Sequence, residues 1–142
     1  MCTKGAAPLL ITRETDYALR ILRALLDGQL HPIGEITQSQ LVPQAFAYKI
    51  LKKLAKAGLV EILRGASGGY RLTADLDRTT LYDLMEAMEE GSEVSACMDP
   101  QYPCPWRAAH GGCSIHCRLA EIQRKLDQEL RAHTLGQLLL AP

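Results

Sequence analysis

The hydrophobic residues of this 142-residue chain change their spacing near Leu59. Before that point, apolar residues recur at the spacing of an amphipathic helix, which predicts three helices. We expect these helices at residues 12–26, 32–37 and 43–57. After Leu59, apolar residues alternate in LVEIL and in YRL, and the turn-rich segment RGASGG between them indicates a β-hairpin. Three helices followed by a hairpin predict a mainly α fold of the winged helix-turn-helix type.

The chain beyond the hairpin begins with another predicted helix. Thr79 or Thr80 is expected to cap the stretch TLYDLMEAMEE, and Gly91 is expected to end it. Prolines and paired glycines then interrupt any periodicity over residues 92–113. A final long helix is expected from about Ser114. Its apolar stripe is typical of a helix that pairs with a partner, and it contains Ile115, Leu119, Ile122, Leu126 and Leu130.

These patterns divide the chain into four regions. We expect a flexible tail at residues 1–11, a winged helix-turn-helix domain at 12–91, a cysteine-rich loop at 92–113, and a dimerisation helix with a C-terminal tail at 114–142. The hydrophobic content of 47% is typical of an ordered domain. No apolar run reaches the roughly 18 residues of a membrane span, and no secretion signal is recognisable, so we expect a cytoplasmic protein.

The charges of this electrically neutral chain are unevenly distributed. Residues 44–73 contain six lysines or arginines and one acidic residue, whereas residues 81–99 contain six acidic residues and no lysine or arginine. A basic segment that coincides with a helix and a hairpin can bind phosphates locally, although the whole molecule is neutral. We therefore expect residues 44–73 to bind double-stranded DNA.

The second helix of a helix-turn-helix enters the major groove with its N-terminal residues at the base edges. Here that helix opens at Pro43, so Gln44 and Tyr48 are expected near bases or sugars, and a glutamine can bind adenine through two hydrogen bonds. Phosphate contacts are expected from Lys49, Lys52 and Lys53. The wing is expected to add Arg64, Ser67, Gly68 and Arg71. The apolar side of the helix is expected to face the core through Phe46, Ile50, Leu51 and Leu54.

The chain concentrates four of its five cysteines between residues 97 and 117. They are Cys97, Cys104, Cys113 and Cys117, in the spacing C-x6-C-x8-C-x3-C, with His116 among them. Thiolates are preferred ligands of iron–sulfur clusters and of zinc. In a reducing cytosol, clustered thiols are more often ligands or sensors than disulfides. The cluster of cysteines therefore predicts a metal or redox site, whereas Cys2 lies apart in the tail and is given no role.

The same cysteines support two alternatives to an iron–sulfur cluster. Cys113 and Cys117 lie one turn apart at a helix start, where a thiolate is stabilised, and a disulfide between them or with Cys104 would make a thiol switch. A zinc site is the second alternative. An enzyme is not expected, because the chain has no nucleophile–base motif, and RGASGGY joins two strands instead of opening a helix as a phosphate loop does.

Three segments, TRETDYALRIL, FAYKILKKLAKAGLVEILRGASGGYRL and TLYDLMEAMEE, resemble the IscR/NsrR family of bacterial regulators, of the Rrf-two type. The resemblance covers residues 12–92, and its most specific part is K-I-L-x-x-L-x-x-A-G-L-V followed by R-G-x-x-G-G-Y. It implies a homodimer that binds a pseudo-palindromic operator, with repression as the expected outcome. It also implies a cysteine-bearing loop before the dimerisation helix, often with an iron–sulfur cluster that reports redox, nitric oxide or iron–sulfur status.

The resemblance leaves two ligand sets open for a [2Fe-2S] or [4Fe-4S] cluster, and both include the first two cysteines of the loop. In the first set, which follows the nitric-oxide-sensing branch, Cys117 is the third ligand and Asp16 of the partner subunit is the fourth, so that Cys113 is extra. In the second set, which follows the branch that controls cluster assembly, Cys113 is the third ligand and His116 is the fourth. The alternatives without a cluster, including protein purified with none, stay open.

Overall fold

Helices α1 (Arg13–Ala24), α2 (Ile33–Gln40) and α3 (Gln44–Lys56) pack against one another around the main hydrophobic core. The structure is a computed structural model that describes residues 9–140, so most of the predicted tail, including Cys2, lies outside the described residues. The fully buried side chains of this core come mainly from α1 and α3 and include Ile21, Leu22, Ile50, Leu51 and Leu54. The three helices occur where their apolar periodicity predicted them.

Phe46 does not face the core as the sequence predicted. Its side chain is 44% exposed and meets the Tyr17 ring of α1 edge-on, with the ring centroids 5.7 Å apart. Ala47 is the fully buried residue of this turn. The reason is helical spacing, because Ala47, and not Phe46, lies three and seven positions before Ile50 and Leu54 on the face that packs inward.

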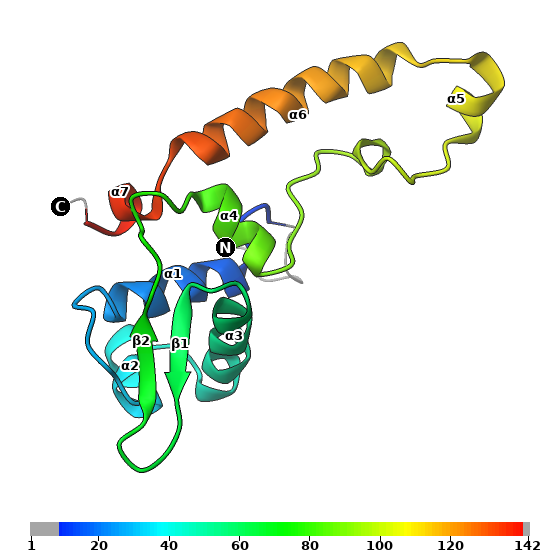
Figure 1. The fold of residues 1–142 in the computed structure, drawn as a ribbon. Coiled ribbons are helices and arrows are strands. Elements are labelled where there is room, and N and C mark those ends of the chain that lie inside the picture. Colours follow the sequence, from blue (N-terminus) through cyan, green and yellow to red (C-terminus); the bar gives the residue numbers. More distant parts are fainter. Residues whose placement is uncertain (1–8, 141–142) are drawn as a thin grey trace, which may run out of the picture.

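Strands β1 (Val60–Leu63) and β2 (Gly69–Leu72) form an antiparallel hairpin beside the three helices (Figure 1). His31 extends the hairpin at one edge, because its main-chain N–H and C=O both bond to Tyr70, with N···O distances of 2.9 and 2.8 Å. Gly69 permits this approach, since a Cβ there would overlap the His31 carbonyl. The helices and the hairpin together confirm the predicted winged helix-turn-helix.

Helix α4 (Leu81–Ala87) begins with a capping box at Thr80, as the sequence predicted. The helix ends at Ala87, with Met88 as its C-cap, so the prediction that Gly91 ends it is wrong. Glu89 adopts the left-handed conformation with φ +61°, and the N–H groups of Glu89 and Glu90 donate back to carbonyls of the last turn at 2.9 and 3.0 Å. These bonds form a Schellman motif with a glutamate in the position that usually belongs to glycine, at a cost of about 1–2 kcal/mol.

From residue 92 the chain leaves the core and returns through a long helix (Figure 1). The outgoing stretch contains the short 3-10 helix η1 (Ala96–Met98) and helix α5 (Pro105–His110), so the predicted loop is not irregular throughout. Helix α6 (Ser114–Ala132) begins where predicted and runs back to the body, where α7 (Leu135–Leu140) follows it. In the described part of the chain, no helix combines the length and the apolarity needed to cross a membrane.

The C-terminal residues pack back onto the N-terminal half of the molecule. The Leu81 N–H donates to the His133 carbonyl at 2.9 Å, and the Leu135 N–H donates to the Thr79 carbonyl at 2.7 Å. Leu135 is fully buried in the main core, and Leu130, the last residue of the predicted stripe, is only 7% exposed within its own chain. The C-terminal end of α6 is thereby fixed to the core, while its N-terminal end extends toward the cysteine loop (Figure 1).

Candidate functional site

The exposed side of α3 contains four of the nine residues predicted to contact DNA. Gln44, Tyr48, Lys49 and Lys52 are all exposed there. Gln44 Nε2 donates a hydrogen bond to the Tyr48 hydroxyl, one helical turn away, at 3.3 Å. The first turn of α3 contains no acidic residue. The positive end of the helix dipole is therefore not neutralised by a carboxylate of its own first turn, which suits an anionic partner such as DNA.

Lys53 lies apart from this surface, although the sequence groups it with Lys49 and Lys52. Its side chain is 19% exposed, and its ammonium group is 2.7 Å from Glu14 Oε1. The same group donates a hydrogen bond to the Met88 carbonyl at 3.1 Å. Lys53 thus joins α3 to α1 and to the end of α4, and its charge is engaged inside the molecule.

The wing presents its predicted contact residues in different ways. Arg64 and Ser67 are exposed near its tip, and Gly68 closes the turn, where a Cβ would overlap the main chain. Arg71 forms an ion pair with Glu61, its direct neighbour across the two strands. Arg64 is therefore the exposed cation nearest the wing tip, whereas the charge of Arg71 is partly neutralised within the hairpin.

A charged cluster around His31 fixes the position of the wing, and sequence reasoning missed it. His31 Nε2 is 2.9 Å from both carboxylate oxygens of Asp27, and Nδ1 is 3.7 Å from Glu35 Oε1. The hydrogen bond to Asp27 raises the pKa of His31, against an opposing effect of burial. Because the main chain of His31 pairs with Tyr70, this cluster ties α2 and the connection between α1 and α2 to the hairpin. The spacing of four residues between the three charged groups was the signal available in the sequence.

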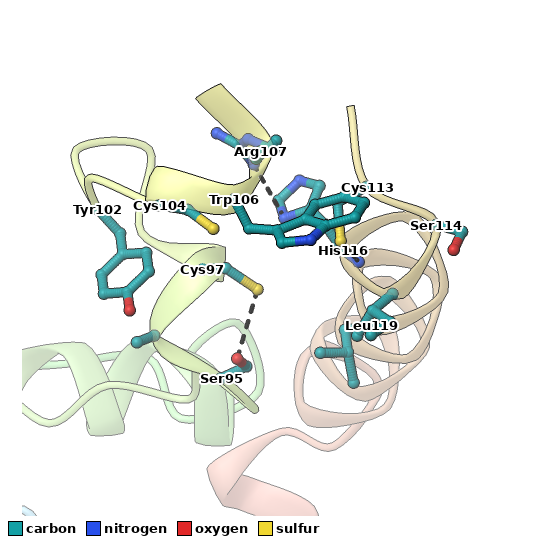
Figure 2. A pocket seen from close by; sticks show the side chains of 12 residues that line it. Ser95, Cys97, Tyr102, Cys104, Trp106, Arg107, Cys113, Ser114, His116 and Leu119 are labelled. Atoms are coloured by element: carbon teal, nitrogen blue, oxygen red, sulfur yellow. Dashed lines mark hydrogen bonds between the residues drawn. The ribbon is translucent and has the colours of Figure 1, made fainter. Parts of the chain in front are cut away.

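Three of the four clustered cysteines line one cavity of about 480 Å³. Cys97 comes from η1, Cys104 is the N-cap of α5, and Cys113 is the N-cap of α6. Figure 2 shows the three sulfur atoms around the Trp106 ring, which also lines the cavity. Three separate segments of the loop therefore bring soft donor atoms to one place.

His116 is a fourth candidate ligand on the same cavity. Its Nδ1 lies 3.1 Å from the Arg107 guanidinium, and because arginine can only donate, Nδ1 accepts this bond. His116 can therefore bind a metal through Nδ1 only when the bond to Arg107 is released. Cys117 is exposed and does not line the cavity. Asp16 lies on α1 and pairs with Arg20 at 3.0 Å. Within one chain, the fold therefore brings His116, but neither Cys117 nor Asp16, to the other three cysteines.

Sequence reasoning did not single out two neighbours of these donors. Arg107 bonds to His116, and the Ser95 hydroxyl lies 3.3 Å from the Cys97 sulfur. Trp106, which also lines the cavity, is 55% exposed and stacks on His110, with the ring centroids 4.0 Å apart. Only the packing of the loop reveals these contacts, because no motif in the sequence specifies them.

Three thiols and one imidazole are a donor set that fits the chemistry of an iron–sulfur cluster. Among residues 9–140, no three histidine, cysteine, aspartate or glutamate side chains lie close enough together to bind one metal ion. The ligands of an iron–sulfur cluster bind different iron atoms, so they need not converge on one point. Three thiols and one imidazole around a shared cavity meet this looser requirement.

The apolar stripe of α6 that was predicted to face a partner is only partly exposed to solvent. Ile115 and Ile122 are 67% and 53% exposed, whereas Leu119 and Leu126 are half-buried and Leu130 is buried. The exposed isoleucines lie on the part of α6 that extends away from the core (Figure 1). An apolar surface is therefore present near the cysteine cavity, which Ile115 and Leu119 also line.

Comparisons with known proteins agree with these features. Residues 11–141 match the family described as Rrf2, iron-dependent transcriptional regulator. Protein aau3 of Rhizobium meliloti strain 1021 is 31% identical over 134 residues, which cover 92% of this chain and 85% of the relative. The HTH-type transcriptional regulator IscR of Vibrio campbellii is 30% identical over 137 residues, which cover 91% of this chain and 76% of the relative.

Among solved structures, CymR (YrzC), the global cysteine regulator of B. subtilis, is similar with a TM-score of 0.68 at 22% identity. The similarity covers 95% of this chain and 99% of CymR, and it supports the fold. The family match extends over nearly the whole described chain, from α1 through α7, and the family consists of transcriptional regulators, not enzymes. The chain therefore belongs to the Rrf2 family of DNA-binding transcriptional regulators.

Proposed function

We propose that this regulator is a homodimeric repressor that senses redox, nitric oxide or iron–sulfur status through an iron–sulfur cluster. The observation that carries the proposal is the single cavity shared by Cys97, Cys104, Cys113 and His116. The description of the family as iron-dependent and the similarity to a regulator named IscR also support it. A cluster, of the [2Fe-2S] or the [4Fe-4S] type, supplies a group whose charge and ligation change with the chemistry of the cell.

The DNA-facing part of the proposal uses the exposed residues of α3 and the wing. Gln44 and Tyr48 are placed at base edges because they are exposed in the first two turns of α3, and Lys49 and Lys52 are placed at phosphates because they are exposed further along the same helix. The wing adds Arg64, Ser67, Gly68 and Arg71 beside the DNA backbone. Phosphate contacts make affinity fall steeply with added salt, so a binding constant that is insensitive to salt would contradict this part.

The dimer part of the proposal uses the free stretch of α6. A second copy packs on Ile115 and Ile122, and the paired recognition helices then read two half-sites of a pseudo-palindromic operator. In such a dimer, the other ligand set contains Cys117 and the partner subunit's Asp16. It requires Cys117 to face the cavity, which Cys117 does not line in this structure. The two ligand sets thus differ at Cys113 and Cys117, which makes these two residues the informative ones.

The test is anaerobic purification of the full chain, followed by an absorption spectrum and by iron and sulfide counts. Cys113→Ser is expected to lose the colour and most of the iron, whereas Cys117→Ser, its matched control, keeps both because Cys117 does not line the cavity. The reverse result would support the ligand set with Cys117 and Asp16. Wild-type protein that contains no iron and sulfide after anaerobic reconstitution would contradict the cluster itself.

A thiol switch is the second candidate, and one local observation favours it. Cys113 caps α6, its sulfur accepts from the His116 N–H at 3.5 Å, and Cys117 is exposed one turn further along. A helix N-terminus stabilises a thiolate, the form that reacts with oxidants. Mass spectrometry after peroxide treatment, with DNA binding measured in parallel, would reveal a disulfide between these residues or with Cys104. Metal analysis of the same samples tests the zinc alternative.

A further inference from the structure

We propose that Lys53 is a positioning residue that links the recognition helix α3 to the root of the cysteine loop, and that it does not contact phosphate. The loop root is defined as residues 88–90, which follow α4 and precede the cysteine segment. The inference rests on the proposed function in one respect, because it names the contacts through which a conformational change of the cysteine loop would move α3. The placement of Lys53 itself does not depend on that function.

The first step concerns the carbonyl group of Met88. The Schellman motif at the end of α4 uses the N–H groups of Glu89 and Glu90, while the carbonyl of Met88 is turned to the side chain of Lys53. A lysine ammonium that donates to a carbonyl at a helix C-terminus satisfies an acceptor which the helix itself cannot. Lys53 thus caps α4 from α3, and the two helices have a polar connection in addition to their apolar packing.

The second step concerns the carboxylate that fixes the lysine. Glu14 of α1 is 2.7 Å from the Lys53 ammonium, and the side chains of both residues are less than one-fifth exposed. An ion pair with so little solvent around it is poorly screened, and it keeps its geometry better than an exposed pair. A phosphate contact by Lys53 would require this pair to break, whereas Lys52 has no such pair among the described residues and is exposed on the same helix.

The third step concerns the other end of the loop root. The Glu90 carboxylate accepts hydrogen bonds from the hydroxyl groups of Thr12 and Thr15, at the start of α1. Thr15 is fully buried, and it is the buried polar residue of the described core. Residues 88 and 90 are therefore bound to α3 and α1 respectively, on either side of the left-handed Glu89.

These contacts make the loop root a junction between the cysteine segment and the DNA-binding surface. A rearrangement of the loop that turns residues 88–90 changes the position of the Met88 carbonyl and of the Glu90 carboxylate together. Lys53 then either follows the carbonyl or loses it, and in both cases α3 shifts relative to α1. A ligand can shift a conformational equilibrium only through contacts that differ between the two states, and this hydrogen bond is such a contact.

The experiment compares Lys53→Met with Lys52→Met in the full chain. The probe is a labelled DNA duplex that the wild-type protein selects from a random-sequence library. Dissociation constants are measured over a range of salt concentrations, with the anaerobically reconstituted protein and with the reduced, cluster-free protein. Lys52→Met is expected to lower the slope of log K against log salt by about 0.9, because one phosphate contact is lost. Lys53→Met is expected to leave that slope unchanged and to bring the ratio of the two dissociation constants to about one.

A second pair of variants keeps the test valid if Lys53→Met folds poorly. Glu14→Gln breaks the same ion pair from α1, together with the longer 3.9 Å pair between Glu14 and Lys49, so this variant is judged by the ratio alone, which is expected to fall. Lys53→Arg keeps a donor and is expected to retain part of the wild-type ratio. A salt slope for Lys53→Met that matches Lys52→Met would overturn the proposal, as would a ratio that stays at the wild-type value. If the wild-type ratio is itself one, the sensing function fails, and the salt slope alone then decides whether Lys53 contacts phosphate.

Discussion

The two functional regions of this regulator are built on supports of very different rigidity. The recognition helix α3 contains four fully buried residues, and its exposed residues are fixed by helical geometry. The cysteine cavity is formed by η1, α5 and the start of α6, and none of the residues of η1 and α5 is buried. The comparison teaches that the proposed DNA-reading surface rests on a packed core, whereas the proposed sensing site has little apolar packing to fix it and is suited to change with what it binds.

The largest expected effect is a difference in stability between a core residue of α3 and a cavity residue. Leu51→Ala removes a fully buried side chain and is expected to destabilise the protein by about 2–5 kcal/mol. Trp106→Ala removes a larger side chain that is 55% exposed, and it is expected to change stability by less than about 1 kcal/mol. Urea unfolding of both variants measures the contrast. Equal losses would show that the cysteine loop is as firmly packed as the core.

A smaller effect is expected where the wing meets α2. Gly69→Ala places a methyl group against the His31 carbonyl, and relief of this overlap is expected to cost about 1–3 kcal/mol and to weaken DNA binding. Gly34→Ala is the matched control, because nothing lies within 4 Å of the added methyl group and Gly34 is inside α2. It is expected to stabilise the protein by up to about 1 kcal/mol. The melting temperatures of the two variants should therefore move in opposite directions, and only Gly69→Ala should lose DNA affinity.

A third prediction concerns the sequence that α3 reads. The hydrogen bond from Gln44 to Tyr48 uses one amide hydrogen. It leaves a carbonyl that can accept from the N6–H of adenine and a second hydrogen that can be donated to adenine N7 in the major groove. Gln44→Ala is expected to abolish selection at one operator position per half-site, with a loss of discrimination of about ten- to 100-fold there. Tyr48→Phe should weaken selection at the same position only. Site selection from random DNA measures both, and a uniform loss across positions would contradict base reading by Gln44.

The sequence predicted the DNA-binding half well because its signals are local. Helical spacing, the capping threonine and the glycine-rich hairpin each act within a few residues of one another, so one sequence is enough to recognise them. The details that it did not predict depend on distant partners. Lys53 looks like a surface cation until the Met88 carbonyl, 35 positions away, is seen beside it. The sequence likewise placed the end of α4 at Gly91, because a left-handed glutamate at position 89 has no signature of its own.

The cysteine site was predicted in composition but not in arrangement. Four thiols in a short segment indicated a soft-ligand site, and the sequence left Cys113 and Cys117 as equivalent candidates for the third position. Their difference comes from the start of α6, where Cys113 is the cap that faces the cavity and Cys117 lies one turn further along and is exposed. The orientation of a loop depends on the packing of several short segments at once, and spacing in the sequence does not encode it.

The smallest expected effect is a pH dependence confined to the wing. Asp27 raises the pKa of His31, so the protonated ring is favoured in the folded protein. The resulting stabilisation is fully present below the unfolded pKa, about 6.5, and is lost as the pH rises through the higher folded pKa. The melting temperature is therefore expected to fall slightly as the pH rises above that unfolded value. The protection of the Tyr70 amide, taken relative to its intrinsic exchange rate at each pH, should fall as well, because this N–H bonds to His31. His31→Gln should show neither change, and a wild-type protein whose wing becomes more protected at higher pH would contradict the assignment of this ion pair as the anchor.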